Sequence, residues 1–230
     1  MPQIKTESVQ FDANGGRAPG YLARPDDNVS HPGVVVIQEW WGLEPHIKDV
    51  AARFAREGFV ALAPDLYRGV VVSEPDEARK LAMGLDREQA ARDIQGALSY
   101  LKGLASVVPK RMGVVGFCMG GSLALFTACR SPDVGAAAVF YGGMMPADED
   151  LARLSAPVLG LYGEEDAGIP LASVEKLRET LQRAGKTHKI HVYPGAGHAF
   201  FNDTRPSHRP EAARDAWERT LAWFQRYLVP

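Results

Sequence analysis

Cysteine is scarce in this sequence, since Cys118 and Cys129 are the only two among 230 residues. Two cysteines are too few for a disulfide scaffold, and such a low content suits a reducing compartment. An excess of one charge is also missing, because 26 Lys and Arg residues stand against 28 Asp and Glu residues. The formal net charge of −2 excludes the strong positive field that holds nucleic acids or anionic membranes.

Long hydrophobic runs are missing as well. The longest aliphatic run, residues 34–37, is far too short to span a bilayer. Residues 1–10 carry charge and contain no apolar core of signal-peptide length. We therefore expect a cytoplasmic protein with no membrane partner. No repeat, low-complexity tract or long linker divides the chain, so we expect a single domain over residues 1–230.

Segments typical of strands and of helices alternate along the chain. The expected strands are 3–11, 18–23, 33–38, 59–63, 112–116, 136–141, 157–162 and 189–193. The expected helices are 45–57, 86–102, 120–129, 170–184 and 209–228. The first two strands indicate an antiparallel pair, and the later alternation predicts an α/β fold. In such a fold, a mostly parallel central sheet is flanked by helices on both faces.

The segment 116–121, Gly-Phe-Cys-Met-Gly-Gly, has the form Gly-x-nucleophile-x-Gly between a strand and a helix. A sharp turn there places the central residue, Cys118, in a strained conformation and projects its side chain. The following helix N-terminus favours a thiolate, and the backbone N–H of Met119 is a candidate oxyanion donor. The alternative is a structural cysteine in a glycine-rich turn, because short glycine motifs are common.

Two further candidate groups follow later strands. Asp166 lies on the loop after 157–162, and His198 follows Pro-Gly-Ala-Gly after 189–193. The carboxyl ends of parallel strands meet at one edge of a sheet, so both side chains are expected near Cys118. The order nucleophile, acid, histidine is that of an α/β-hydrolase triad. His198 would then accept the thiol proton or pair with the thiolate, while Asp166 orients the imidazole.

The loop after 33–38 begins with Glu39-Trp40-Trp41-Gly42. In an α/β hydrolase this loop supplies the second oxyanion donor, here the backbone N–H of Trp40. Glu39 is unusual as a carboxylate at the end of an apolar strand. Two interpretations stay open for it: a rim residue paired with an arginine, or a contact with the Cys118 thiol in the resting state.

The remaining candidates carry weaker signals. Tyr141 and Phe200 follow strands near the candidate triad, and we expect such residues to line an apolar pocket that binds the substrate. Cys129 is expected to be a small core residue, and His46 a surface or loop residue. His188 and His191 form no recognised zinc-binding spacing, so no metal and no organic cofactor is expected.

Five segments together resemble the dienelactone hydrolase family. They are Gln-Glu-Trp-Trp-Gly-Leu at 38–43, Ala-Pro-Asp-Leu-Tyr at 63–67, the cysteine turn at 116–121, Gly-Glu-Glu-Asp at 163–166 and Gly-Ala-Gly-His-Ala-Phe at 195–200. The resemblance implies a small α/β-hydrolase fold without a large cap domain. It also implies a triad of Cys118, Asp166 and His198, and a Glu39 that holds the resting thiol until substrate binding releases it.

The resemblance further implies that two arginines bind a carboxylate of the substrate. The approximate matches are Arg79, at the end of an acidic segment, and Arg205, which follows His198 at a longer spacing. The leading hypothesis is a cysteine-dependent hydrolase that opens an enol-lactone or a related activated ester through an acyl-thioester on Cys118. The alternatives are another ester or thioester substrate, a thiol redox protein, or a non-catalytic ligand-binding module. The sequence leaves the oligomeric state open and is compatible with a monomer.

Overall fold

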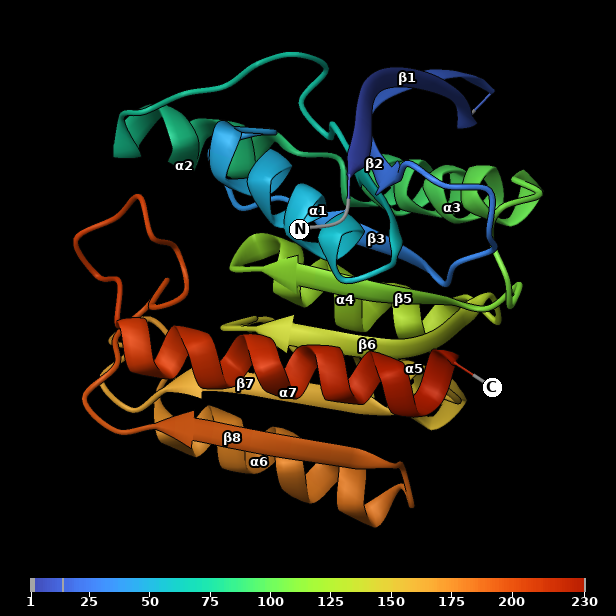
Figure 1. Cartoon of the computed structure of the whole chain (residues 1–230). Coiled ribbons are helices and arrows are strands. Elements are labelled where there is room, and N and C mark those ends of the chain that lie inside the picture. The colour runs from blue at the N-terminus through green and yellow to red at the C-terminus, as the bar shows by residue number, and fades with distance from the viewer. Residues whose placement is uncertain (1–2, 14, 230) are drawn as a thin grey trace.

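An eight-stranded sheet forms the centre of the computed structural model, which describes residues 3–13 and 15–229 (Figure 1). The strands are β1 (Ile4–Ala13), β2 (Gly16–Pro25), β3 (Gly33–Ile37), β4 (Val60–Pro64), β5 (Met112–Phe117), β6 (Val134–Phe140), β7 (Val158–Gly163) and β8 (His188–Tyr193). Their order is β1-β2-β4-β3-β5-β6-β7-β8. The β1–β2 and β2–β4 pairs are antiparallel, and all later pairs are parallel. The expected α/β fold with a mostly parallel sheet is confirmed.

Helices cover both faces of this sheet. They are α1 (Pro45–Arg56), α2 (Pro75–Gly84), α3 (Arg87–Gly103), α4 (Met119–Arg130), α5 (Asp148–Arg153), α6 (Leu171–Arg183) and α7 (Pro210–Leu228). Figure 1 shows α7 in front of the sheet and α4 and α6 behind it. On the α7 face, the ring of Phe54 from α1 lies 4.5 Å from that of Trp217 from α7. This aromatic contact joins the two helices over the parallel strands.

Burial explains why the central strands are apolar throughout. Every residue of β3 to β7 is buried, because helices cover both faces of the parallel part of the sheet. The edge strand β8 is only partly buried, and it accordingly mixes histidine, lysine and tyrosine with aliphatic residues. The carboxyl ends of the central strands therefore form a rigid edge on which loops can place side chains.

The structure adds two helices that the sequence pattern did not predict. Helix α2 buries only Ala78, and α5 has six residues and buries only Leu151. Neither carries the apolar stripe from which an amphipathic helix is recognised. The expectation for His46 was wrong, since its side chain is buried on α1 and its ring lies 6.4 Å from that of Phe117. Across residues 3–13 and 15–229, no helix is both long enough and apolar enough to cross a membrane.

Candidate active site

Cys118 lies at the sharp turn between β5 and α4. Its backbone adopts φ 56° and ψ −119°, a left-handed conformation that is strained for a residue with a side chain. Two backbone hydrogen bonds fix this turn: the Cys118 N–H donates to the Phe140 carbonyl at 3.0 Å, and the Cys118 carbonyl accepts from the Gly121 N–H at 3.0 Å. The side chain is partly exposed. The turn therefore presents the Cys118 thiol at the carboxyl edge of the sheet.

Glycines are required around this turn because backbones approach one another closely. A Cβ atom on Gly116 would overlap the carbonyl of Gly120. A Cβ atom on Gly120 would in turn overlap the carbonyl of Gln38, the residue directly after β3. Backbone atoms cannot move aside as a flexible side chain can. The glycine pattern at 116–121 is thus explained by the geometry of the turn.

His198 and Asp166 form a short hydrogen bond beside Cys118. The Nδ1 atom of His198 lies 2.6 Å from Oδ2 of Asp166. The other oxygen of Asp166 accepts the backbone N–H groups of Gly168 at 2.9 Å and Ile169 at 3.1 Å. Asp166 is buried, so these three contacts fix its carboxylate in one orientation. The carboxylate in turn fixes the orientation of the imidazole ring.

The pKa of His198 is raised to about 10. Burial alone would lower this pKa, but hydrogen bonds to Asp166 and Cys118, together with the negative charges of both groups, outweigh it. An imidazole with this pKa stays protonated through neutral pH. The site can therefore hold an imidazolium between a carboxylate and the cysteine sulfur.

Glu39 is held by two buried donors behind the candidate triad. Its Oε1 accepts the hydroxyl of Tyr141 at 3.2 Å, and its Oε2 accepts the side-chain N–H of Asn202 at 2.8 Å. The amide orientation of Asn202 is fixed because its Oδ1 accepts from the backbone N–H of Thr204 at 3.0 Å and from the Thr204 hydroxyl at 2.7 Å. Burial raises the pKa of Glu39, and the two donors offset part of that rise.

Glu39 is 1% exposed and has no arginine partner within the described residues, so its interpretation as a rim residue paired with an arginine is wrong, whereas the resting-state contact with the Cys118 thiol stays a prediction. Within the described residues, its hydrogen-bond partners include neither an arginine nor the Cys118 thiol. One of its partners is instead Asn202, which the sequence pattern did not single out. An asparagine in a loop carries no distinguishing signal, because its partner lies 163 residues away along the chain.

A cavity of about 510 Å³ opens above Cys118. Its lining residues are Glu39, Trp40, Trp41, Cys118, His198, Ala199, Arg205, Pro206 and Ser207. Its volume falls in the range usual for small-molecule sites, roughly 300–1,000 Å³. Trp40 belongs to this wall, and Met119 begins α4 directly after Cys118 with its sulfur 3.6 Å from the Tyr67 hydroxyl. The first N–H groups of a helix have no partner within the helix, so that of Met119 is available as a donor.

The structure brings one of the two candidate arginines to the cavity. Arg205 lines it, with the guanidinium 3.9 Å from the ring centroid of Trp41 and a hydrogen bond of 3.3 Å to Glu44. Arg79 is not among the lining residues. Its side chain is 64% exposed on α2, where it lies 3.9 Å from Asp76.

Tyr141 and Phe200 lie behind the wall of the cavity. Both side chains are fully buried, and their ring centroids are 5.6 Å apart. The ring of Tyr141 also lies 5.0 Å from the imidazole of His198. In this arrangement the two rings support Glu39 and His198 and have no surface in contact with the cavity. Among the described residues, no group of three or more His, Cys, Asp or Glu side chains could hold a metal ion.

The sheet order and the left-handed turn between β5 and α4 define the class of this protein as an α/β hydrolase. A family model described as the dienelactone hydrolase family matches residues 18–228. The chain therefore belongs to the dienelactone hydrolase family. It is an ester or lactone hydrolase of that type, and its substrate is a small molecule.

Similar proteins span the whole length of the chain. A "Putative carboxymethylenebutenolidase" of Methylorubrum extorquens is 37% identical over 255 residues, which cover 100% of this chain and 88% of the relative. A protein of the same name from Escherichia coli K12 is 36% identical, and the match covers 95% of this chain and 86% of that relative. A crystal structure named "Putative Dienelactone Hydrolase", from Klebsiella pneumoniae, is 34% identical in sequence. The match covers 98% of this chain and 100% of the chain in that structure, with a TM-score of 0.91.

Proposed function

We propose that this hydrolase uses Cys118 as its nucleophile and opens an enol-lactone or a related activated ester through an acyl-thioester. One observation carries the proposal: Cys118 and His198 line the same cavity, His198 is hydrogen-bonded to Asp166, and both Asp166 and Cys118 raise the pKa of His198. A histidine that stays protonated at neutral pH stabilises a thiolate beside it. The thiolate is the form of cysteine that attacks a carbonyl carbon.

In the first half of the reaction, the thiolate of Cys118 bonds to the carbonyl carbon of the substrate. The carbonyl electrons move onto oxygen, where the backbone N–H groups of Trp40 and Met119 stabilise the negative charge. When the adduct collapses, the bond to the ring oxygen breaks, and His198 donates its proton to the departing enolate oxygen. The product of this step is an acyl-thioester on Cys118 with a neutral His198.

In the second half, His198 takes a proton from water, and the hydroxide attacks the thioester carbonyl. The carbon–sulfur bond breaks, which releases the acid and restores the thiolate and imidazolium pair. A thiolate leaves readily, so the first adduct returns to substrate unless the other leaving group is also good. An enolate is such a group, whereas an amide nitrogen is not, and this favours lactones and activated esters.

Glu39 is assigned a role in the resting enzyme by the same proposal. Cys118 and His198 line the same cavity, while Tyr141 and Asn202 hold Glu39. In the proposed resting state the thiol contacts Glu39, and substrate binding releases it toward His198. Glu39 and Cys118 line the same cavity, which is compatible with such a contact.

Arg205 is the group that we assign to a carboxylate of the substrate. Its guanidinium lies in the cavity wall, and its buried Nε has no hydrogen-bond partner among the described residues. Stacking on Trp41 keeps the plane of the guanidinium in place. A carboxylate of the ligand would supply the missing acceptor and replace the contact with Glu44.

A redox function receives little support from the position of the second cysteine. Cys118 is the N-cap of α4, and Cys129 lies near the end of the same helix. Their Cα atoms therefore lie about 16 Å apart along the helix axis. A disulfide requires Cα atoms within about 7 Å. Burial also raises the pKa of Cys129 to about 12, which keeps its thiol unreactive.

Replacement of the proposed nucleophile tests the function. Cys118→Ala should abolish turnover of an activated ester such as p-nitrophenyl acetate, while Cys118→Ser should leave weak activity because a hydroxyl is much less acidic than a thiol. Cys129→Ala serves as the control and should keep the wild-type rate. A Cys118→Ala protein that hydrolyses the ester at a near-normal rate would remove the proposal.

A further inference from the structure

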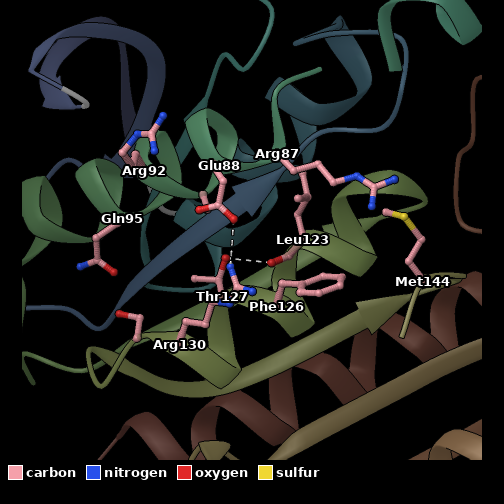
Figure 2. A pocket seen from close by; sticks show the side chains of 11 residues that line it. Arg87, Glu88, Arg92, Gln95, Leu123, Phe126, Thr127, Arg130 and Met144 are labelled. Atoms are coloured by element: carbon pink, nitrogen blue, oxygen red, sulfur yellow. Dashed lines mark hydrogen bonds and ion pairs between the residues drawn. The ribbon is translucent and has the colours of Figure 1, made fainter. Parts of the chain in front are cut away.

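A second cavity, of about 430 Å³, lies between α3 and α4 (Figure 2). One side of α4 forms its floor with Leu123, Phe126 and Thr127, which the helical spacing of three and four residues brings together. None of its lining residues belongs to the cavity above Cys118. Its volume is also within the range of small-molecule sites, roughly 300–1,000 Å³.

The charge at the rim of this cavity is positive. Arg130 is already balanced, since it lies 3.4 Å from Glu88 and 3.1 Å from Asp150. Arg87 also lines the cavity and, within the described residues, has no carboxylate within ion-pair distance. It is the first residue of α3, where the helix dipole disfavours a positive charge. A negative group bound at this place would compensate that charge.

Apolar groups suited to a flat ring lie next to Arg87. Figure 2 shows the side chains of Arg87 and Met144 pointing toward each other near the ring of Phe126. An aromatic ligand can stack with an offset on Phe126 and contact the Met144 thioether, while a guanidinium binds a carboxylate through two parallel hydrogen bonds. Ser131 also lines the cavity; it is 94% buried, and its hydroxyl has no hydrogen-bond partner among the described residues.

From these contacts we propose that the cavity between α3 and α4 binds a flat aromatic monocarboxylate. The carboxylate contacts Arg87, and the ring lies against Phe126 and Met144. An aliphatic acid would lose the stacking, and a neutral aromatic molecule would lose the ion pair. The site is independent of the chemistry assigned to Cys118, so it can be tested in a protein that does not turn over.

Methionine methyl groups report separately on the two cavities. In protein with ¹³C-methyl methionine, Met144 reports on the second cavity and Met119 on the site at Cys118; Met144→Leu and Met119→Leu assign the two signals. We expect titration with 2-naphthoate to shift the Met144 signal with a saturable curve. Neutral 2-naphthamide and aliphatic octanoate should each shift it at least about tenfold less strongly at equal concentration.

Three variants decide the outcome. Arg87→Ala should weaken the 2-naphthoate response of Met144 about tenfold or more, and Ala91→Phe should block it by filling the cavity, both with unchanged ester turnover. Arg214→Ala removes an exposed arginine on α7 and should change nothing. A Met144 signal that does not move, that responds equally to all three compounds, or that is unaffected by Arg87→Ala would overturn the proposal. Movement of Met119 alone would do the same, because it places the ligand only at Cys118.

Discussion

His198 is the residue whose protonation state governs the proposed chemistry. Its pKa of about 10 lies above the ordinary value of 6.5, so the imidazolium persists through neutral pH and is lost as pH rises through about 10. Burial and two neighbouring groups determine this pKa. Burial opposes the charge, while Asp166 and Cys118 favour it strongly enough to reverse the sign of the shift.

Asp166→Asn should lower the pKa of His198, because the variant loses both a negative charge and a strong acceptor. The imidazolium would then be lost at a lower pH than in the wild type, and kcat/KM for an activated ester should fall roughly 10²–10⁴-fold. Histidine NMR against pH measures the titration directly. Asp215→Asn is the matched control, because it removes a carboxylate that accepts a hydrogen bond from Tyr193, and it should leave the titration of His198 unchanged. Equal midpoints for His198 in wild type and Asp166→Asn would contradict the assignment of this carboxylate.

Asn202 and Tyr141 are positioning residues in this account, since each acts through Glu39. Both donors lower the pKa of Glu39, so Asn202→Leu and Tyr141→Phe should each raise it further. We expect the pH dependence of Cys118 alkylation without substrate to move to higher pH in both variants. Glu39→Gln has no carboxyl to titrate, and there the same two changes should produce no shift. Identical alkylation rates across pH in wild type and Glu39→Gln would show that Glu39 does not control the reactivity of the Cys118 thiol.

At the scale of secondary-structure elements, the turn from β5 into α4 depends on close backbone contact with β3. A Cβ atom on Gly120 would overlap the Gln38 carbonyl and lie 2.5 Å from that of Ile37. Relief would require α4 to move away from β3, and this movement would displace both Cys118 and the Met119 N–H. The same element therefore sets stability and the geometry of the oxyanion site.

Gly120→Ala should lower the free energy of unfolding by about 1–3 kcal/mol or more, as overpacking does elsewhere, and should also lower activity. Gly84→Ala is the matched control, because nothing lies within 4 Å of a Cβ atom at that position in α2. Alanine there should be neutral or stabilising by up to about 1 kcal/mol. Urea unfolding of the two variants compares them directly, and equal midpoints would contradict the account of the turn.

The strands and turns that are buried on both faces of the sheet were largely predictable from the sequence. The apolar runs of β3 to β7 and the glycines around Cys118 carry strong signals, because backbone packing permits few alternatives. Helix α2 was missed because it buries a single alanine and so leaves no periodic apolar pattern. The burial of His46 was missed because it follows from the packing of α1 against Phe117 and Phe201, which local sequence does not record.

For the molecule as a whole, a formal net charge of −2 leaves no general attraction for anions. In the proposed mechanism, a preference for a carboxylate-bearing ester therefore comes from Arg205 in the cavity wall. Its assignment illustrates what sequence alone could not decide, since Arg79 and Arg205 were equal candidates until the fold placed only Arg205 in the cavity. Asn202 shows the same limit, because its contact with Glu39 joins distant parts of the chain.

Arg205→Met should therefore raise KM about tenfold or more for an ester that carries a carboxylate. For the neutral ester of the same size, KM should stay within about twofold. Arg79→Met is the control and should leave both values unchanged, since that side chain is exposed on α2. An equal loss for charged and neutral esters in Arg205→Met would show a general packing defect and contradict the assignment.

The most direct test of the central claim is to trap the covalent intermediate. Wild-type protein mixed with p-nitrophenyl acetate and quenched in acid within milliseconds should gain one acetyl group in intact mass spectrometry, and peptide mapping should place it on Cys118. Cys118→Ala should gain none. An acetyl group at another residue that tracks turnover, or rapid turnover with no adduct on Cys118, would contradict the account.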